Sequence, residues 1–161
     1  MLTLSTTTAK KNVGMGQIIL GRDDDALTSV LGSCIGLIMT HPAVGISVFA
    51  HIVLPASDGR TGPPGKFVDT AVPHMLEMMK QAGALPSALI IKMAGGASMF
   101  GHGSAVQIGT DNADAMRNAL SDAELELAGE DVGGVKGRRV TLNCATGELL
   151  IEVVGLRPEV L

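Results

Sequence analysis

Two apolar runs separated by a short turn place the strongest constraint on the fold. The runs "TSVLGSCIGLIMT" and "ISVFAHIVL" are joined by "HPAVG", in which Pro42 suits the second position of a turn and Gly45 can take a positive φ at its exit. Apolar runs of strand length on either side of a tight turn are typical of antiparallel pairing. The sequence therefore predicts a β-hairpin between Thr28 and Pro55.

Each run contains one reactive side chain, Cys34 or His51, although a polar group in an apolar run costs free energy unless it is satisfied. If the turn is centred between Pro42 and Ala43, Cys34 lies directly opposite His51. If residues 42–45 form a four-residue loop, the two are diagonal neighbours. Both registers place the side chains on one face, roughly 5 Å apart when opposite and about 7–8 Å apart when diagonal.

A thiol beside an imidazole is a nucleophile suited to acyl transfer. The imidazole takes the thiol proton, and the resulting imidazolium stabilises the thiolate and can protonate a leaving amine. We therefore expect a lowered pKa for Cys34. A third polar residue usually orients the ring, and Thr28 and Ser33 are the nearby hydroxyls. Backbone N–H groups around Ser33–Cys34 are candidates for binding an oxyanion, with Gly32 and Ser33 as supporting backbone, because a glycine allows unusual dihedrals beside the nucleophile.

A purely structural role for the same cysteine stays open, because free cysteine is a common small core residue. Cys144 provides the internal comparison, since no histidine lies near it in sequence and it is expected to pack in the core. The other histidines, His41, His74 and His102, are scattered and lack the spacing of a zinc site. No metal and no cofactor are expected.

The rest of the chain alternates apolar runs with turn signals. Strands are predicted at 13–20, 87–93 and 124–129 and in a terminal hairpin at 138–155, and helices at Asp69–Ala82 and 111–123, the second capped by Asp111 or Asn112. These elements indicate a single α/β domain over 13–161, preceded by a flexible leader over 1–12.

Composition excludes several classes of function. With three Phe, no Trp and no Tyr, and a net charge of −4, the chain is poorly suited to binding nucleic acid. No apolar run approaches the ~18 residues that span a bilayer, and the N-terminus lacks the pattern of a secretory signal. Two distant cysteines do not form a disulfide framework. We expect a cytoplasmic protein that neither inserts into membranes nor binds nucleic acid.

Three glycine-rich loops, 55–66, 94–103 and 130–137, are candidates for the rim of a shallow cleft. "AGGASMFGHG" lacks the Gly-Lys-Ser/Thr ending of a P-loop and the spacing of a dinucleotide fold, so a structural turn or a wall of the cleft is expected. The basic stretch "KGRR" would suit an acidic protein partner. The candidate substrate- or partner-binding residues are Gly95, Gly96, Ser98, Phe100, Arg138 and Arg139.

Five segments resemble the CheD family, the chemoreceptor glutamine deamidases: "LGSCIGLIMTHPAVGISVFAHIVLP", "GKFVDTAVPHMLEMMKQAGA", "KMAGGASMF", "IGTDN" and "EDVGGVKGRRVTLNCATGELL". They occur in the family's order and at similar spacing over residues 13–154. The resemblance places the family's catalytic cysteine, histidine and threonine on Cys34, His51 and Thr28. This sequence departs from the family at "HP", where the family often has Asp-Pro. It also departs at "IGTDN", where the family tends to have a basic residue before the asparagine.

The resemblance implies a single-domain layered sandwich of mixed or antiparallel β-sheets flanked by helices, similar to the cysteine deamidases of certain bacterial toxins. It implies hydrolysis of selected glutamine side chains to glutamate, with release of ammonia, on cytoplasmic helices of methyl-accepting chemotaxis receptors. A CheC-type phosphatase is a further implied partner. Two alternatives stay open: a dominant methylesterase activity on receptor glutamyl esters, and a docking module whose catalysis is vestigial.

Overall fold

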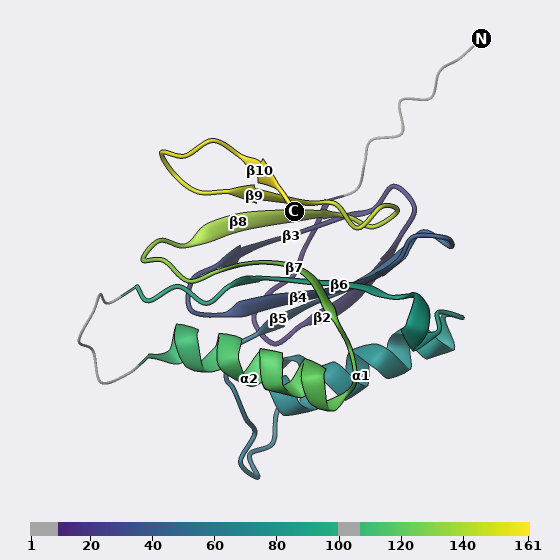
Figure 1. Ribbon diagram of the computed structural model, residues 1–161, viewed down its shortest axis with the longest axis horizontal. Coiled ribbons are helices and arrows are strands. Elements are labelled where there is room, and N and C mark those ends of the chain that lie inside the picture. The colour runs from purple at the N-terminus through teal and green to yellow at the C-terminus, as the bar shows by residue number, and fades with distance from the viewer. Residues whose placement is uncertain (1–9, 100–106) are drawn as a thin grey trace.

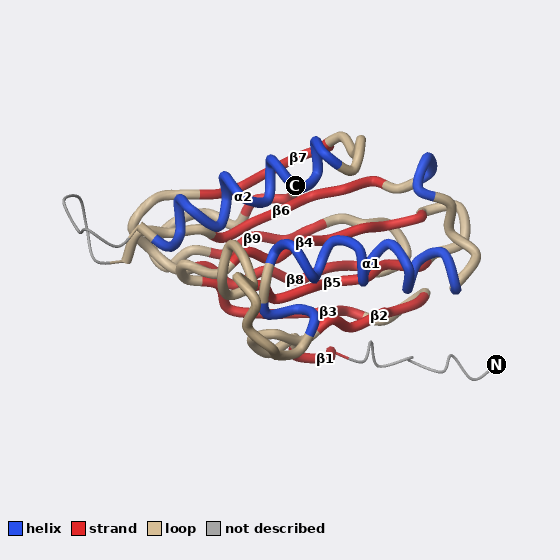
Figure 2. The backbone as a smooth tube through the Cα atoms, turned by 90° about the horizontal axis from the view of Figure 1, so that it is seen from below, coloured by secondary structure: helices blue, strands red, loops and turns tan. Residues whose placement is uncertain are grey.

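The computed structural model, in which residues 10–99 and 107–161 are described, is a sandwich of three layers (Figure 1). One outer layer is a five-stranded sheet, sheet A, and the middle layer is a second five-stranded sheet, sheet B. Two α-helices, α1 (Val68–Gln81) and α2 (Ile108–Asp122), form the third layer and lie on the same side of sheet B (Figure 2). The expected layered α/β sandwich is confirmed.

The elements follow one another in chain order. They are β1 (Lys10–Asn12), β2 (Ile18–Arg22), β3 (Ala26–Leu31), β4 (Ile35–His41), β5 (Ile46–Ile52), the short 3₁₀ helix η1 (Pro64–Lys66), α1 (Val68–Gln81), η2 (Pro86–Ala88), β6 (Ile90–Gly95), α2 (Ile108–Asp122), β7 (Leu127–Val132), β8 (Arg138–Asn143), β9 (Leu149–Glu152) and β10 (Glu159–Val160). Sheet A has the strand order β1-β3-β8-β9-β10, and sheet B has the order β2-β5-β4-β6-β7. Both sheets are mixed, because β1 runs parallel to β3 and β6 runs parallel to β7, while the other pairs are antiparallel.

Two apolar cores separate the three layers. The larger core fills the space between sheet B and the helices, and includes Met75 and Met79 of α1 and Met116 of α2. The second core lies between the two sheets and includes Phe49 of β5 and Leu142 of β8. Methionine and aliphatic side chains fill the space that aromatic residues occupy in most domains. Sheet B is therefore buried on both faces, whereas sheet A has one face on solvent.

The predicted hairpin forms with the wider of its two registers. In the β4–β5 pair Gly36 lies opposite His51, as required by a four-residue loop at 42–45, and Gly45 takes a φ of 66° at the loop exit. Cys34 is consequently a diagonal neighbour of His51 on the same face of the sheet. The observed register is thus one of the two that the turn allowed.

The first run of the hairpin is not one strand, in contrast to the expectation. It divides into β3 in sheet A and β4 in sheet B, and residues 32–34, the crossover loop, carry the chain from one sheet to the other. Two further expectations are wrong in detail. Lys10–Asn12, expected within the leader, pairs with β3 as β1. Helix α2 begins at Ile108, so both Asp111 and Asn112 lie inside the helix and neither caps it.

Candidate active site

Cys34 is the last residue of the crossover loop. Its side chain is 8% exposed and packs in the core between the two sheets. The loop owes its position to two pairings, because β3 is held by β8 in sheet A while β4 is held between β5 and β6 in sheet B. The nucleophile candidate therefore sits where the chain bends sharply between two rigid sheets, an arrangement that fixes a reactive group on a scaffold.

His51 lies on β5, and its side chain is 5% exposed. Residues alternate between the faces of a strand, so His51 shares a face with Phe49, which belongs to the core between the sheets. Its ring points toward β3 of sheet A, where it is hydrogen-bonded. Sheet register and side-chain alternation thus bring Cys34 and His51 into the same layer of the molecule.

The imidazole of His51 is held by two oxygens. Its Nδ1 lies 2.8 Å from Ser29 Oγ and 3.0 Å from the backbone carbonyl of Val13. Ser29 Oγ also donates to that carbonyl at 2.7 Å. A carbonyl can only accept, so we assign the ring hydrogen to Nδ1. This tautomer leaves the lone pair of Nε2 to take a proton from a thiol.

Thr28 is not brought to His51, which corrects the expected orienting contact. Its hydroxyl donates to the Val140 carbonyl at 3.0 Å and lies 3.2 Å from the hydroxyl of Thr141 on β8. The physical reason is the alternation of β3, which turns Thr28 toward the outer face of sheet A. Its backbone still contributes indirectly, because its carbonyl accepts from the N–H of Val13 at 2.8 Å.

Burial governs the resting ionisation of the pair. It raises the pKa of the Cys34 thiol above its ordinary value of 9.0. It lowers the pKa of the His51 imidazole below 6.5, although the hydrogen bond to the Val13 carbonyl opposes this shift in part. The expected low thiol pKa is therefore wrong for the resting site. Thiol and imidazole rest as a neutral pair, because desolvation disfavours both charged forms.

Comparison with known proteins identifies the family. A family described as "CheD chemotactic sensory transduction" matches residues 53–153. The chain is 39% identical over 147 residues to "Chemoreceptor glutamine deamidase CheD" of Thermotoga maritima, covering 91% of this chain and 93% of that protein. "Probable chemoreceptor glutamine deamidase CheD" of Symbiobacterium thermophilum is 41% identical over 151 residues, covering 89% of this chain and 92% of that protein. The chain belongs to the CheD family.

The crossover loop of this CheD family member has all three of its carbonyls bound. The Gly32 carbonyl accepts from Ala97 N–H at 2.9 Å, and the Cys34 carbonyl accepts from Gly96 N–H at 2.9 Å. The Ser33 carbonyl accepts from the side chain of Asn112 at 3.0 Å. Within the described residues, the N–H groups of Ser33 and Cys34 have no such partner. They are the groups that an oxyanion would need.

The glycine loop after β6 supports the nucleophile. Gly95 has a φ of 112°, and a Cβ added there would lie 2.1 Å from the Cys34 carbonyl oxygen. Only glycine allows β6 to approach the crossover loop this closely. Gly96 is also buried, so neither glycine is exposed to a partner, while Ser98 is half-buried and donates its N–H to Gly134 at 2.9 Å. Phe100 lies outside the described residues.

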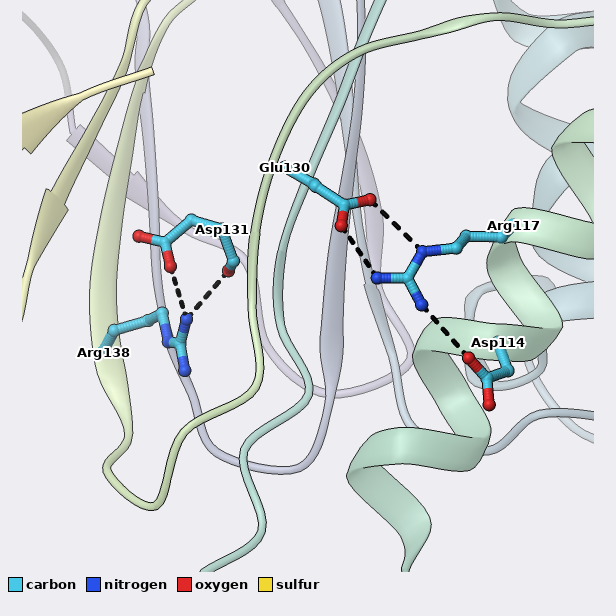
Figure 3. Close-up of polar contacts among 5 residues, drawn as sticks. All are labelled: Asp114, Arg117, Glu130, Asp131 and Arg138. Carbon is cyan, nitrogen blue, oxygen red and sulfur yellow. Dashed lines mark hydrogen bonds and ion pairs between the residues drawn. The ribbon is translucent and has the colours of Figure 1, made fainter.

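The two candidate arginines have different environments. Arg138 is 6% exposed, and its Nη1 donates to the side chain and the carbonyl of Asp131 at 2.8 Å each (Figure 3). Its Nη2 donates to the Gly133 carbonyl. Strand alternation turns Arg138 toward the core and leaves Arg139 exposed. Arg138 therefore holds residues 131–133, where β7 ends and the glycine loop begins, and contributes no exposed charge to a partner, which corrects the expected basic patch.

A second cluster in Figure 3 fixes α2 against sheet B. Arg117 of α2 donates to Glu130 of β7 at 2.8 Å and to Asp114 at 3.1 Å.

Among the described residues, no group of three or more acidic, histidine or cysteine side chains could hold a metal ion. Neither helix in the described ranges is long and apolar enough to cross a membrane.

Sequence reasoning missed two residues that contact the site. The sequence gives no sign that Ser29 faces the core while the run from Thr28 to Thr40 is read as one strand. Once the break at 32–34 is known, the alternation of Leu27, Ser29 and Leu31 turns the Ser29 side chain inward. The sequence pattern indicates Asn112 only as a possible helix cap. A buried asparagine on a polar helix start is a weak signal, since Asn is equally common at caps.

Mutation can distinguish the contribution of the Ser29 hydroxyl to the orientation of His51 from that of the Thr28 hydroxyl. Ser29→Ala removes one of the two acceptors of His51 Nδ1, and we expect kcat to fall about three- to tenfold, the effect of one hydrogen bond. Thr28→Val keeps the shape of the side chain and should change kcat less than Ser29→Ala does. Steady-state kinetics of both variants is the measurement. A large loss in Thr28→Val with a normal Ser29→Ala would return the orienting role to the threonine.

Proposed function

We propose that this chain hydrolyses glutamine side chains of chemoreceptors to glutamate, with Cys34 as the nucleophile. The observation that carries the proposal is the placement of Cys34 and His51 on one buried face, with His51 Nδ1 hydrogen-bonded so that Nε2 is the ring nitrogen with the lone pair. The relatives named as chemoreceptor glutamine deamidases support the substrate. We propose the cytoplasm as the location, where the receptor helices lie.

The reaction proceeds through a thioester. His51 Nε2 takes the thiol proton as the Cys34 sulfur forms a bond to the side-chain carbonyl carbon of the glutamine. The N–H groups of Ser33 and Cys34 donate to the oxyanion. The C–N bond then breaks, and the imidazolium returns its proton to the leaving group, which departs as ammonia. Water, deprotonated by His51, adds to the thioester, and the C–S bond breaks to give glutamate and the free thiol.

A neutral resting pair suits this chemistry. The amide nitrogen is a poor leaving group unless it is protonated, so the proton taken from Cys34 must stay on His51 until the C–N bond breaks. The buried site keeps bulk water from that proton, since Cys34 and His51 are both more than nine-tenths buried. Thr28 acts in this proposal through its backbone contact to Val13, and Ser29 holds the ring.

The proposed partners are the cytoplasmic helices of methyl-accepting chemotaxis receptors and a CheC-type phosphatase. Of the basic stretch, Lys136 and Arg139 are exposed and are available to acidic partner surfaces, while Arg138 is not. Two alternatives use the same fold. A methylesterase would attack a receptor glutamyl ester with the same cysteine, and a docking module would need neither Cys34 nor His51.

Substrate comparison tests the proposal. We expect kcat/KM for ammonia release from an intact receptor cytoplasmic fragment to exceed that for free glutamine by at least about a hundredfold, because binding energy from remote contacts positions the amide. A short glutamine peptide should fall between them. Methanol release from the methyl-esterified fragment, measured in parallel, decides between amide and ester.

Arg139→Glu tests whether the exposed basic surface contributes to recognition of the receptor fragment. This exposed charge reversal should lower kcat/KM on the receptor fragment at low salt and leave turnover of free glutamine unchanged. Equal kcat/KM on all three amide substrates would contradict recognition of a protein. Faster turnover of the ester than of the amide would favour the methylesterase instead.

A further inference from the structure

Asn112 of α2 joins the two segments that carry Cys34 and His51. Its side chain is fully buried, and its Nδ2 donates to the Ser33 carbonyl and to the Val53 carbonyl at 3.0 Å each. Because both partners are carbonyls that only accept, the amide must present its NH₂ group to them, which fixes the assignment of its oxygen and nitrogen. One amide thus bridges the residue before the nucleophile and the residue directly after β5, the strand that carries the base.

The start of α2 is seated against the end of β6, which fixes the position of this amide. A Cβ added at Gly109 would lie 2.4 Å from the Ala97 carbonyl oxygen, so the helix packs backbone against backbone there. Ala97 in turn donates to the Gly32 carbonyl of the crossover loop at 2.9 Å. Asn112, one turn into the helix, therefore reaches the loop from a rigid base. Its Oδ1 is buried and has no partner among the described residues.

The hydrogen bond to Ser33 has a consequence for the neighbouring amide. In a planar trans peptide the C=O and the following N–H point in opposite directions. Because the Ser33 carbonyl points at Asn112, the N–H of Cys34 must point away from α2. The bond from Ala97 to the Gly32 carbonyl orients the N–H of Ser33 in the same way. Both N–H groups are left without a partner in the described residues, as a preformed oxyanion site requires.

We infer that Asn112 is a positioning residue for this reaction, which holds the Ser33–Cys34 peptide so that the Cys34 N–H is aimed at the developing oxyanion. The inference rests on the proposed function, because an oxyanion forms only in acyl transfer. Asn112 is the asparagine of "IGTDN", where the family tends to have a basic residue before the asparagine and this chain has Asp111. The role inferred for Asn112 does not depend on that basic residue.

The test uses two reactions of the same cysteine. Deamidation passes through an oxyanion, whereas alkylation of Cys34 by iodoacetamide is a direct displacement that needs none. Asn112→Asp keeps the shape and turns a carboxylate oxygen toward both carbonyls. We expect kcat on the receptor fragment to fall about ten- to hundredfold with KM changed less than about twofold, somewhat below the loss of a whole oxyanion donor. The alkylation rate should change less than about twofold.

Acidification provides a second readout. The carboxyl group introduced by Asn112→Asp regains one donor when it is protonated, so the kcat of this variant relative to the unchanged protein should rise as the pH falls. Ser47→Ala is the matched control, since Ser47 is fully buried and donates to the Cys144 carbonyl at 2.8 Å, far along the sheet from the loop. This control should leave the ratio of deamidation to alkylation unchanged.

The outcomes distinguish the inference from the function on which it rests. If Asn112→Asp does not fold, Asn112→Ser replaces it, and the same ratio of deamidation rate to alkylation rate is measured for that variant. Thermal unfolding confirms that the variant used is folded. Deamidation and alkylation reduced by one common factor would mean a structural role and overturn the inference alone, as would normal deamidation. No deamidation by the unchanged protein would overturn the proposed function and this inference with it.

Discussion

Cys34→Ala is expected to lower the turnover of receptor glutamine by at least about a thousandfold, to a level set by binding and the oxyanion site alone. No other described thiol can replace it, because the only other cysteine, Cys144, is fully buried against Gly21 at the far end of the sheet. Burial also raises the pKa of Cys144 to about 12, so its thiolate is absent at neutral pH. Ammonia release from a receptor fragment measures the effect.

Cys144→Ala is the matched control for this result. It removes a sulfur from the core and should cost some stability, on the order of 1 kcal/mol, while leaving kcat within about twofold. Thermal unfolding and kinetics of both variants separate folding from catalysis. If Cys34→Ala turned over the fragment as fast as the unchanged protein, the thioester route would be contradicted.

His51→Gln is expected to lower kcat by about a hundred- to ten-thousandfold, the range of a general acid–base group. Glutamine keeps a polar side chain near Ser29 and the Val13 carbonyl but cannot take the thiol proton at neutral pH. Steady-state kinetics is the measurement. A loss below about tenfold would mean that another group activates Cys34.

The pH dependence follows from the directions of the two pKa shifts. His51 acts as a neutral base, and burial lowers its pKa below 6.5, so kcat/KM should be retained at pH 6.5 and be lost only as the pH falls through that lower pKa. Burial raises the pKa of Cys34 above 9.0, so its alkylation rate should still rise above pH 9. An alkylation plateau at acidic pH would reveal a preformed thiolate–imidazolium pair and contradict the neutral resting state.

The hairpin could be predicted because local chemistry determines it. Pro42 and Gly45 define the turn, the turn limits the register to two choices, and both choices put Cys34 and His51 on one face. The apolar patterns indicated strands mixed with helices, and the family resemblance implied the layered α/β sandwich. These inferences needed only short-range patterns and a resemblance covering nearly the whole chain.

The break at residues 32–34 leaves only a weak signal, Gly32 and Ser33, between two apolar runs that fit one long strand as well as two short ones. Whether a strand passes into a second sheet is decided by pairing with distant segments, here β8 and β6. Without the division of this run into β3 and β4, the sequence does not show that the Ser29 side chain faces inward. It also suggests an orienting contact for the Thr28 side chain, which hydrogen-bonds to β8 instead. The polar β1, which pairs through its backbone at the edge of sheet A, carries no hydrophobic period to detect.

Charge and ionisation were the least predictable features. Arg138 and Arg139 are adjacent and chemically alike, yet alternation in β8 buries the first beside Asp131 and exposes the second. The resting pKa of Cys34 depends on its depth in the core between the sheets, which spacing in the sequence does not reveal. Both features depend on which face of a strand meets the core.

Intact-mass analysis of a chemoreceptor cytoplasmic fragment tests the central claim most directly. Replacing NH₂ by OH adds about one dalton for each glutamine converted through the acyl-enzyme. Incubation with the unchanged protein should increase the mass of the fragment, and peptide mapping should place the change on glutamine side chains. Incubation with Cys34→Ala should leave the mass unaltered. An unaltered mass with both proteins, or the same increase with both, would contradict the account.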